Sequence, residues 1–298
     1  MKTVCFLGDS ITRRGYWIAE IFEQLRTRGT VVYNCGVSGD SASGAIDRLY
    51  SDCLCRTPDT VVMMFGMNDV GRTLYDEGAG DTEERKRARI EKYESSLRRL
   101  CDMLKDADCR IILCTPTPYN DVTPSDLPRC YVNEGLAACA DTVRRLAGEL
   151  GVPCVDFFAE LMPMLGREYT TLPDMVHPTP ESHHPMAQIF LRTLGLTDTY
   201  DPTPFLPMSE EAQARYDVEQ YLREIYFIEW NQMYGERKKR KMTHADFLAL
   251  AESRLEKART TSDERQTRWY ETYLATVENR EEYESELVRR TLAMVRGR

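Results

Sequence analysis

Lys2-Thr-Val-Cys-Phe-Leu7 opens the chain and runs directly into Gly8-Asp9-Ser10, and this stretch decides the fold. The residues before Gly8 are mostly apolar and rich in β-formers, which predicts a short buried strand. An amphipathic helical pattern begins near Tyr16. Ser10 is therefore expected just past the carboxyl end of a strand, where open α/β sheets bind their ligands. Taken alone, Gly-Asp-Ser is equally typical of a turn in which Asp or Ser caps the following helix.

The alternation of strand and helix continues along the chain and predicts the fold class. Five apolar strand patterns each precede a helical one, which indicates an α/β protein of three layers, α/β/α, around a five-stranded parallel sheet. The strands after the first are expected at 31–33, 60–65, 111–114 and 152–155, and the helices at 16–28, around 46–50, and at 83–107, 131–149 and 184–194.

The composition changes after the last of these helices, which predicts a boundary. We expect the α/β domain over residues 1–200, a proline-rich linker over 201–208 and a helical extension over 209–298. Residues 209–297 contain no proline or cysteine, and their apolar residues recur three or four apart, as in packed helices. Three roles stay open for the extension: a lid over the Ser10 pocket, the interface of a homo-oligomer, or a stabilising wrap.

Charge and hydropathy exclude several classes of partner. A net charge of −9 argues against a nucleic-acid surface, and the basic run 237–241 is interpreted as a solvated helix end or loop. No apolar run approaches the roughly 20 residues that span a bilayer, and residues 2–7 are too short for a signal-peptide core. We therefore expect a soluble, cytoplasmic protein with no membrane and no nucleic acid among its partners.

The ten cysteines are expected to be free thiols. Several lie inside apolar strand patterns, where cysteine behaves as a small core residue. Cys53-Leu-Cys55 is one residue short of a Cys-x-x-Cys pair, and no second pair completes a zinc site. This pattern favours a reducing compartment.

Four polar segments align with the predicted strand ends and carry a resemblance. They are Gly8-Asp9-Ser10, Gly36-Val-Ser-Gly39, Gly66-Met-Asn68-Asp69 and Asp174-Met-Val-His177. In this order they resemble the SGNH hydrolases, also called the GDSL esterase/lipase family, over residues 1 to about 196. The resemblance implies a flavodoxin-like SGNH hydrolase domain and a serine esterase.

The resemblance also assigns chemical roles to a catalytic triad. Ester hydrolysis needs a nucleophile, a base that activates it and an acid that orients the base. Ser10 is the expected nucleophile, His177 the expected base, and Asp174 the residue that holds the imidazole tautomer. No cofactor is required for this reaction.

The family also uses three donors for the negative charge of the tetrahedral intermediate. Carried over, they are the backbone N–H of Ser10, the backbone N–H of Gly39 and the side-chain amide of Asn68. Gly39 is preferred to Gly36 because Gly39-Asp40 matches the glycine-aspartate of the family's second segment.

Plainer interpretations of individual residues remain open. Asn68 is also typical of a turn, and Asp9 and Asp69 are expected to bond loop backbone rather than act as acids. The adjacent His183 and His184 invite a metal site, but neighbouring side chains rarely ligate one ion, and we expect no metal.

The substrate is expected to be a small-molecule ester. The absence of a long apolar stretch favours a small soluble acyl or acetyl ester, with an acetylated carbohydrate as one form, over a membrane lipid. A lysophospholipase or thioesterase-type acylhydrolase is the alternative within the family. The rival from another class is a binding protein that kept the fold and lost turnover.

Overall fold

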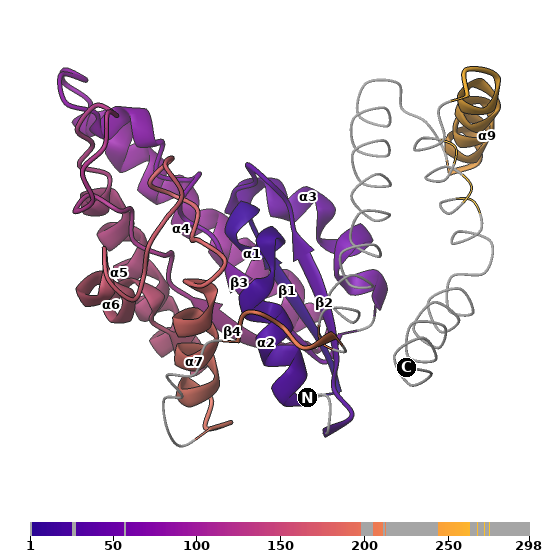
Figure 1. Cartoon of the computed structure of the whole chain (residues 1–298), viewed down its shortest axis with the longest axis horizontal. Helices are drawn as coiled ribbons and strands as arrows, with labels where there is room; N and C mark the ends of the chain where they lie inside the picture. The colour runs from indigo at the N-terminus through magenta and orange to yellow at the C-terminus, as the bar shows by residue number, and fades with distance from the viewer. Residues whose placement is uncertain are drawn as a thin grey trace. The chain divides into compact units, whose positions relative to one another are not determined.

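Five parallel strands form a single sheet in the order β2-β1-β3-β4-β5, which confirms the predicted fold class (Figure 1). This computed structural model describes residues 2–25, 28–56, 58–197, 205–210 and 244–262, together with Ala212, Thr267, Glu271 and Leu274. The strands are β1 (Thr3–Gly8), β2 (Val31–Gly36), β3 (Thr60–Met64), β4 (Arg110–Cys114) and β5 (Cys154–Val155).

Helices cover both faces of this sheet. From β1 the chain moves to β2 at one edge of the sheet, and from β2 onward each connection leads toward the opposite edge, which is β5. Because the crossovers are right-handed, α2 lies on one face of the sheet and α3, α4 and α5 lie on the other. Accordingly, α2 packs on α7, whereas α4 packs on both α3 and α5. The helices of this unit are α1 (Ser10–Arg14), α2 (Tyr16–Leu25), α3 (Ala42–Asp52), α4 (Glu83–Asp106), α5 (Asn133–Leu150), α6 (Phe157–Leu161) and α7 (His183–Thr193).

Aromatic side chains fill the core between the sheet and the face that carries α2 and α7. Trp17 of α2 packs edge-on against Phe6 of β1 and against Phe157 of α6, with ring centroids 5.2 and 5.5 Å apart. Phe190 of α7 lies 5.5 Å from Phe6. All four rings are fully buried, so the strand that leads to Ser10 is fixed from this side.

The carboxyl ends of the strands are in register. Gly8 of β1 pairs with Gly36 of β2 and with Met64 of β3, and Met64 pairs with Cys114 of β4. Cys114 in turn pairs with Val155 of β5. The polar segments that begin at Gly8, Gly36 and Gly66 therefore start at the same level of the sheet, at the carboxyl ends of β1, β2 and β3.

The helix α1 lies ahead of Tyr16, where the sequence pattern predicts that the first amphipathic helix begins. Five residues are too few to show an amphipathic period, and Gly15, with φ of 72°, separates α1 from α2. Asp9 caps α1 by accepting a hydrogen bond from the N–H of Ile11 at 2.9 Å. Ser10 is thus the first residue of a helix rather than part of a loop.

Two glycines let α1 lie directly on the strand ends. A Cβ atom at Gly8 would stand 2.1 Å from Oγ1 of Thr12 and 2.7 Å from the carbonyl of Met64. A Cβ atom at Gly36 would stand 2.3 Å from the backbone nitrogen of Arg13. Neither position has room for a side chain, so glycine is required there by close approach.

The cysteines whose side chains the structure describes are free thiols, as predicted, and all but the half-buried Cys154 are buried. They pack as small apolar residues at the sheet and its helices. The side chain of Cys55 lies outside the described residues.

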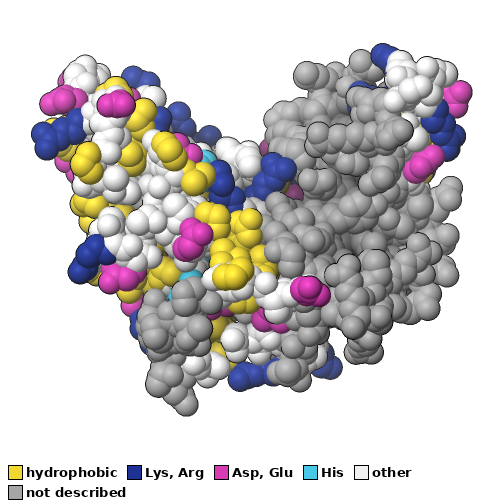
Figure 2. Space-filling view, viewed as in Figure 1, with side chains coloured by type: hydrophobic (Ala, Val, Ile, Leu, Met, Phe, Trp, Pro, Cys, Tyr) yellow, Lys and Arg dark blue, Asp and Glu magenta, His cyan; other side chains and the backbone are white. Residues whose placement is uncertain are grey.

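Charged groups are dispersed over the face of the first unit that Figure 2 shows. On the face shown in Figure 2, the described Lys and Arg side chains alternate with acidic and apolar ones rather than forming one basic patch. Within the described part of the chain, no helix combines the length and the apolarity needed to cross a bilayer.

The chain divides into two compact units, Met1–Pro207 and Met208–Arg298. In the second unit the structure describes α9 (His244–Thr260), on which Leu255 and Ala258 are buried. The other helices expected between 209 and 298, the basic run 237–241 and positions 201–204 of the expected linker lie outside the described residues.

Candidate active site

Ser10 and His177 meet at the carboxyl edge of the sheet although 167 positions separate them in sequence. The Nε2 atom of His177 lies 2.7 Å from Oγ of Ser10. β1 and α1 position the serine, and the loop between α6 and α7 positions the histidine. A hydroxyl this close to a ring nitrogen is the arrangement that activates a serine nucleophile.

Asp174 orients His177 from the other side of the ring. Its Oδ2 atom lies 2.7 Å from Nδ1 of His177, while its Oδ1 atom accepts hydrogen bonds from the N–H groups of Val176 and His177 at 3.0 and 2.9 Å. Partial burial acts to raise the pKa of Asp174, but these hydrogen bonds outweigh it and lower the pKa. The carboxylate is therefore ionised and accepts from the imidazole.

The loop that carries both residues is braced by backbone hydrogen bonds. The N–H of Leu172 donates to the carbonyl of His177 at 2.8 Å, and that of Asn120 donates to the carbonyl of Met175 at 2.9 Å. Met175 has φ of 63°, a left-handed conformation that is uncommon outside glycine. These contacts hold the loop in the bend that turns His177 toward Ser10.

The ring can have only one useful tautomer in this geometry. An ionised carboxylate can only accept, so Nδ1 carries the proton and donates to Asp174. Nε2 is then free of a proton and accepts from the hydroxyl of Ser10. The arrangement can remove the serine proton as the hydroxyl attacks a carbonyl carbon.

Two of the three candidate oxyanion donors follow the strands on either side of β1: Gly39 comes after β2 and Asn68 after β3. The N–H of Asp40 donates to the carbonyl of Val37 at 3.2 Å, which closes a turn with Gly39 at its third position and φ of 76° there. Glycine suits the positive φ that a type II turn needs at this place. The amide Nδ2 of Asn68 donates to the carbonyl of Asp40 at 2.8 Å, which links this turn to the loop after β3.

All the residues named from the sequence therefore fall at one edge of the sheet. Ser10, His177 and Asp174 form a continuous hydrogen-bonded chain, and Gly39 and Asn68 lie on segments joined through Asp40. Their catalytic roles remain predictions.

Two buried acids stand beside these segments. Asp9 accepts a hydrogen bond from the N–H of Ile11 at 2.9 Å, and Asp69 accepts one from the N–H of Ala42 at 3.0 Å. Burial raises the pKa of Asp9 to about 7 and that of Asp69 to about 6, and the negative charges of Asp69 and Asp40 raise the pKa of Asp9 further. Both acids bond backbone N–H groups, as the sequence predicted, but these groups belong to the first turns of α1 and α3 rather than to loops.

The raised pKa of Asp9 makes a prediction about stability. Between about pH 4 and pH 7 the folded protein binds more protons at Asp9 than the unfolded chain does, so stability from this group falls as pH rises. Asp9→Asn removes the ionisation and keeps a good N-cap. We expect this variant to melt at least about 2 °C above the parent at pH 8 and to lose that advantage at pH 4.5, measured by thermal denaturation.

Asp59→Asn is the matched control for this prediction. Burial acts to raise the pKa of Asp59, but hydrogen bonds from Thr3, Arg110 and Lys2 hold it well below its usual range. Its ionised form stabilises the fold, so Asp59→Asn should melt lower than the parent at pH 8. Equal shifts for Asp9→Asn at both pH values would contradict the assignment.

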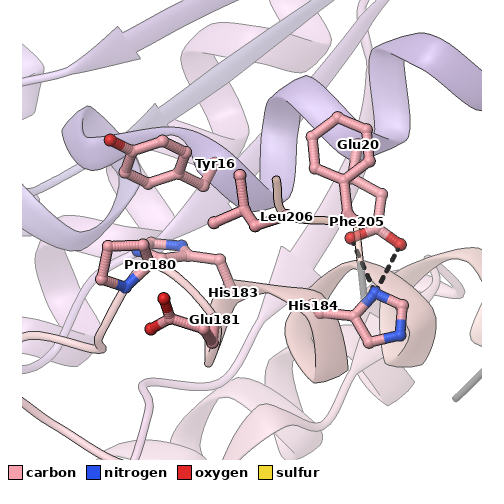
Figure 3. A pocket seen from close by; sticks show the side chains of 8 residues that line it. All are labelled: Tyr16, Glu20, Pro180, Glu181, His183, His184, Phe205 and Leu206. Atoms are coloured by element: carbon pink, nitrogen blue, oxygen red, sulfur yellow. Dashed lines mark hydrogen bonds and ion pairs between the residues drawn. The ribbon is translucent and has the colours of Figure 1, made fainter. Parts of the chain in front are cut away.

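The adjacent histidines at the start of α7 are held by the core rather than by the Ser10 site. His184 faces the carboxylate of Glu20, with Nδ1 3.0 Å from each oxygen (Figure 3). Gln188 donates to the same carboxylate at 2.6 Å. His183 is buried beside Tyr16, and this burial lowers its pKa to about 3. Among the described residues, no group of three or more His, Cys, Asp or Glu side chains is placed to hold a metal ion.

Arg48 is a buried residue of this edge that the sequence analysis did not single out. Its guanidinium donates to the carbonyl of Gly8 and to the carboxylate of Asp40. The available signal was a charged residue on the apolar face of α3, in line with Ala45 and Leu49.

The sequence of this chain is similar to those of known ester hydrolases. A model of the GDSL-like lipase/acylhydrolase family matches residues 6–184. An acetylxylan esterase of Geobacillus stearothermophilus is 31% identical over 215 residues, which cover 65% of this chain and 94% of that protein. A GDSL esterase/lipase of Arabidopsis thaliana is 24% identical over 200 residues, which cover 60% of this chain and 80% of that protein.

Solved structures share the fold. The crystal structure of Axe2, an acetylxylan esterase from Geobacillus stearothermophilus, is 27% identical with a TM-score of 0.52, over 65% of this chain and 94% of that chain. A gut microbial diltiazem-metabolizing enzyme is 16% identical with a TM-score of 0.74, over 97% of this chain and 94% of that chain. This second likeness shows the fold alone.

Proposed function

Because this chain belongs to the GDSL-like lipase/acylhydrolase family and is a carboxylic ester hydrolase, we propose that it removes acetyl groups from a small soluble ester, such as an acetylated carbohydrate. The observation that carries the mechanism is the chain of hydrogen bonds from Asp174 through His177 to Ser10. The choice of an acetyl ester is supported by the acetylxylan esterase relative, of which this chain covers 94%.

In the first half of the reaction, Oγ of Ser10 attacks the ester carbonyl carbon and its proton passes to Nε2 of His177. The carbonyl oxygen takes the negative charge and accepts hydrogen bonds from the N–H groups of Ser10 and Gly39 and from the side-chain amide of Asn68. Collapse of this intermediate breaks the bond to the alcohol. The leaving alcohol takes the proton from His177, and the acyl group stays on Ser10.

In the second half, water attacks the acyl-enzyme. His177 takes a proton from the water as it adds to the carbonyl carbon, and the same donors hold the second oxyanion. The intermediate then expels Oγ of Ser10, which regains its proton from His177. The products are a carboxylic acid and the free serine, while Asp174 balances the imidazolium charge in each half.

A series of acyl chain lengths tests the proposed substrate. We measure kcat/KM on aryl esters carrying acetyl, butyryl, octanoyl and palmitoyl groups, and on an acetylated xylo-oligosaccharide. A pocket fitted to acetyl should prefer it over octanoyl by on the order of tenfold or more, because poorly fitted methylenes cost transition-state binding. Acetate release from the oligosaccharide should proceed at least as well as from the aryl ester.

The alternatives are outcomes of the same experiment. A preference for octanoyl or palmitoyl, or turnover of a lysophospholipid or acyl thioester above acetyl esters, would overturn the acetyl proposal in favour of a long-chain acylhydrolase. No turnover of any ester by the folded protein would favour a binding protein on the same fold.

A further inference from the structure

Arg48 is a fully buried cation in the middle of α3. Its side chain is 0% exposed, and it lies on the helix face that packs toward the sheet. A guanidinium carries five N–H donors and is strongly destabilising in the protein interior unless those donors are bonded. The acceptors of these donors therefore indicate which parts of the fold Arg48 holds in place.

The acceptors come from four places in the chain. Nε donates to Oδ2 of Asp40 at 2.7 Å, and Nη2 donates to the carbonyl of Gly8 at 3.0 Å. Nη1 donates to the carbonyl of Cys35 at 2.7 Å and to Oδ2 of Asp52 at 2.9 Å. Two of these acceptors are backbone carbonyls at the carboxyl ends of β1 and β2.

Each of the three candidate oxyanion donors is adjacent to this network. Gly8 lies two residues before Ser10, and Asp40 directly follows Gly39. The backbone carbonyl of Asp40 accepts the hydrogen bond from Nδ2 of Asn68 at 2.8 Å. One guanidinium thus ties together the segments that present all three donors.

We infer that Arg48 is a positioning residue for the oxyanion hole, which it sets by bonding simultaneously to Gly8 and Asp40. The inference rests on the function proposed above. Oxyanion donors act by being aimed in advance at the charge of the transition state, so a displacement of a fraction of an ångström lowers kcat. Ground-state binding of the ester depends much less on the same distances.

Arg48→Lys tests this inference. A lysine ammonium keeps the charge but has a single nitrogen, so it cannot reach the Gly8 carbonyl, Asp40 and Cys35 together. We expect kcat on an acetyl aryl ester to fall about 10- to 100-fold with KM changed by less than about threefold, measured well below the melting temperature of each variant.

Asp52→Asn is the matched control. It alters the partner of Arg48 that lies at the end of α3, away from the oxyanion donors, and leaves the bonds to Gly8 and Asp40 in place. We expect it to lower the melting temperature while kcat stays within about threefold of the parent. If Arg48→Lys and Asp52→Asn lose stability and kcat in the same proportion, Arg48 only stabilises the fold and the inference is overturned.

A double-mutant cycle with Asn68→Ala separates positioning from general damage. If Arg48 acts through the oxyanion hole, Arg48→Lys should cost at least about threefold less in the Asn68→Ala background than in the parent, because one positioned donor is already gone. Fully additive losses would contradict the inference.

Asp40→Asn keeps the inference testable if Arg48→Lys does not fold. It retains one acceptor oxygen for the guanidinium and should lower kcat about 3- to 10-fold with little change in KM. An unchanged kcat in Asp40→Asn would then overturn the inference. Ser10→Ala reports separately on the proposed function: activity in that variant refutes the serine mechanism, whereas the outcomes above concern Arg48 alone.

Discussion

Ser10→Ala is expected to lower kcat for ester hydrolysis by on the order of 10⁵ to 10⁶, with the fold unchanged. The substitution removes the hydroxyl bonded to Nε2 of His177, so no acyl-enzyme can form on this chain of groups. The helix α1 should persist, since its cap is the side chain of Asp9. Steady-state kinetics on an acetyl ester, with circular dichroism as the check on folding, measure this effect.

Ser38→Ala is the control for that result. Ser38 is an exposed serine two residues from β2 whose hydroxyl accepts from Nη1 of Arg13 at 3.2 Å. It lies in the Gly36–Gly39 segment, but its hydroxyl bonds to Arg13 whereas Nε2 of His177 bonds to Ser10, and we expect kcat within about threefold of the parent. A Ser10→Ala protein that keeps more than about a hundredth of the parent activity would rule out Ser10 as the nucleophile.

Asp174→Asn is expected to produce the second-largest loss, on the order of 10³ to 10⁴ in kcat. The reason lies in how the side chain is held. Oδ1 accepts from the N–H groups of Val176 and His177, and an asparagine oxygen can keep both bonds. The amide NH₂ must then face Nδ1 of His177, which moves the ring proton to Nε2 and leaves Ser10 without a base.

The stability of Asp174→Asn distinguishes this mechanism from loop damage. Because the two backbone hydrogen bonds survive, the melting temperature should change by less than about 3 °C. Nitrogen chemical shifts of the imidazole should report the Nε2–H tautomer. A loss of kcat below tenfold, or an unchanged tautomer, would show that Asp174 does not orient His177.

The sheet and the site segments were predictable because each has a local signature. Buried parallel strands are continuous apolar runs, and 60–65 is wholly apolar after its first residue. The amphipathic period likewise located α4 and α5 to within a few residues of their ends. Ser10, Asn68, Asp174 and His177 were predicted because four short segments stand in the order that resembles the GDSL family, with Ser10 and Asn68 each just after an apolar strand pattern.

What the sequence did not reveal depends on contacts between distant segments. Arg48 donates to the carbonyl of Gly8, 40 positions away, and the sequence around position 48 does not predict which carbonyl its guanidinium contacts. The bond from Asn120 to the carbonyl of Met175 joins two loops in the same way. The sequence pattern did not reveal α1 for a different reason. A five-residue helix is defined by its N-cap and its closing glycine rather than by an amphipathic period.

The absence of side chains at Gly8 and Gly36 has a consequence for how such an enzyme can diversify. The space a Cβ atom would need at either position is filled by α1 or by the neighbouring strand, so the place of the nucleophile is set by the sheet itself. A lineage acquiring a new substrate can therefore rebuild the loops around the site, including 118–132, without relocating the reacting atom. Selection is free to act on specificity while these two glycines preserve the chemistry.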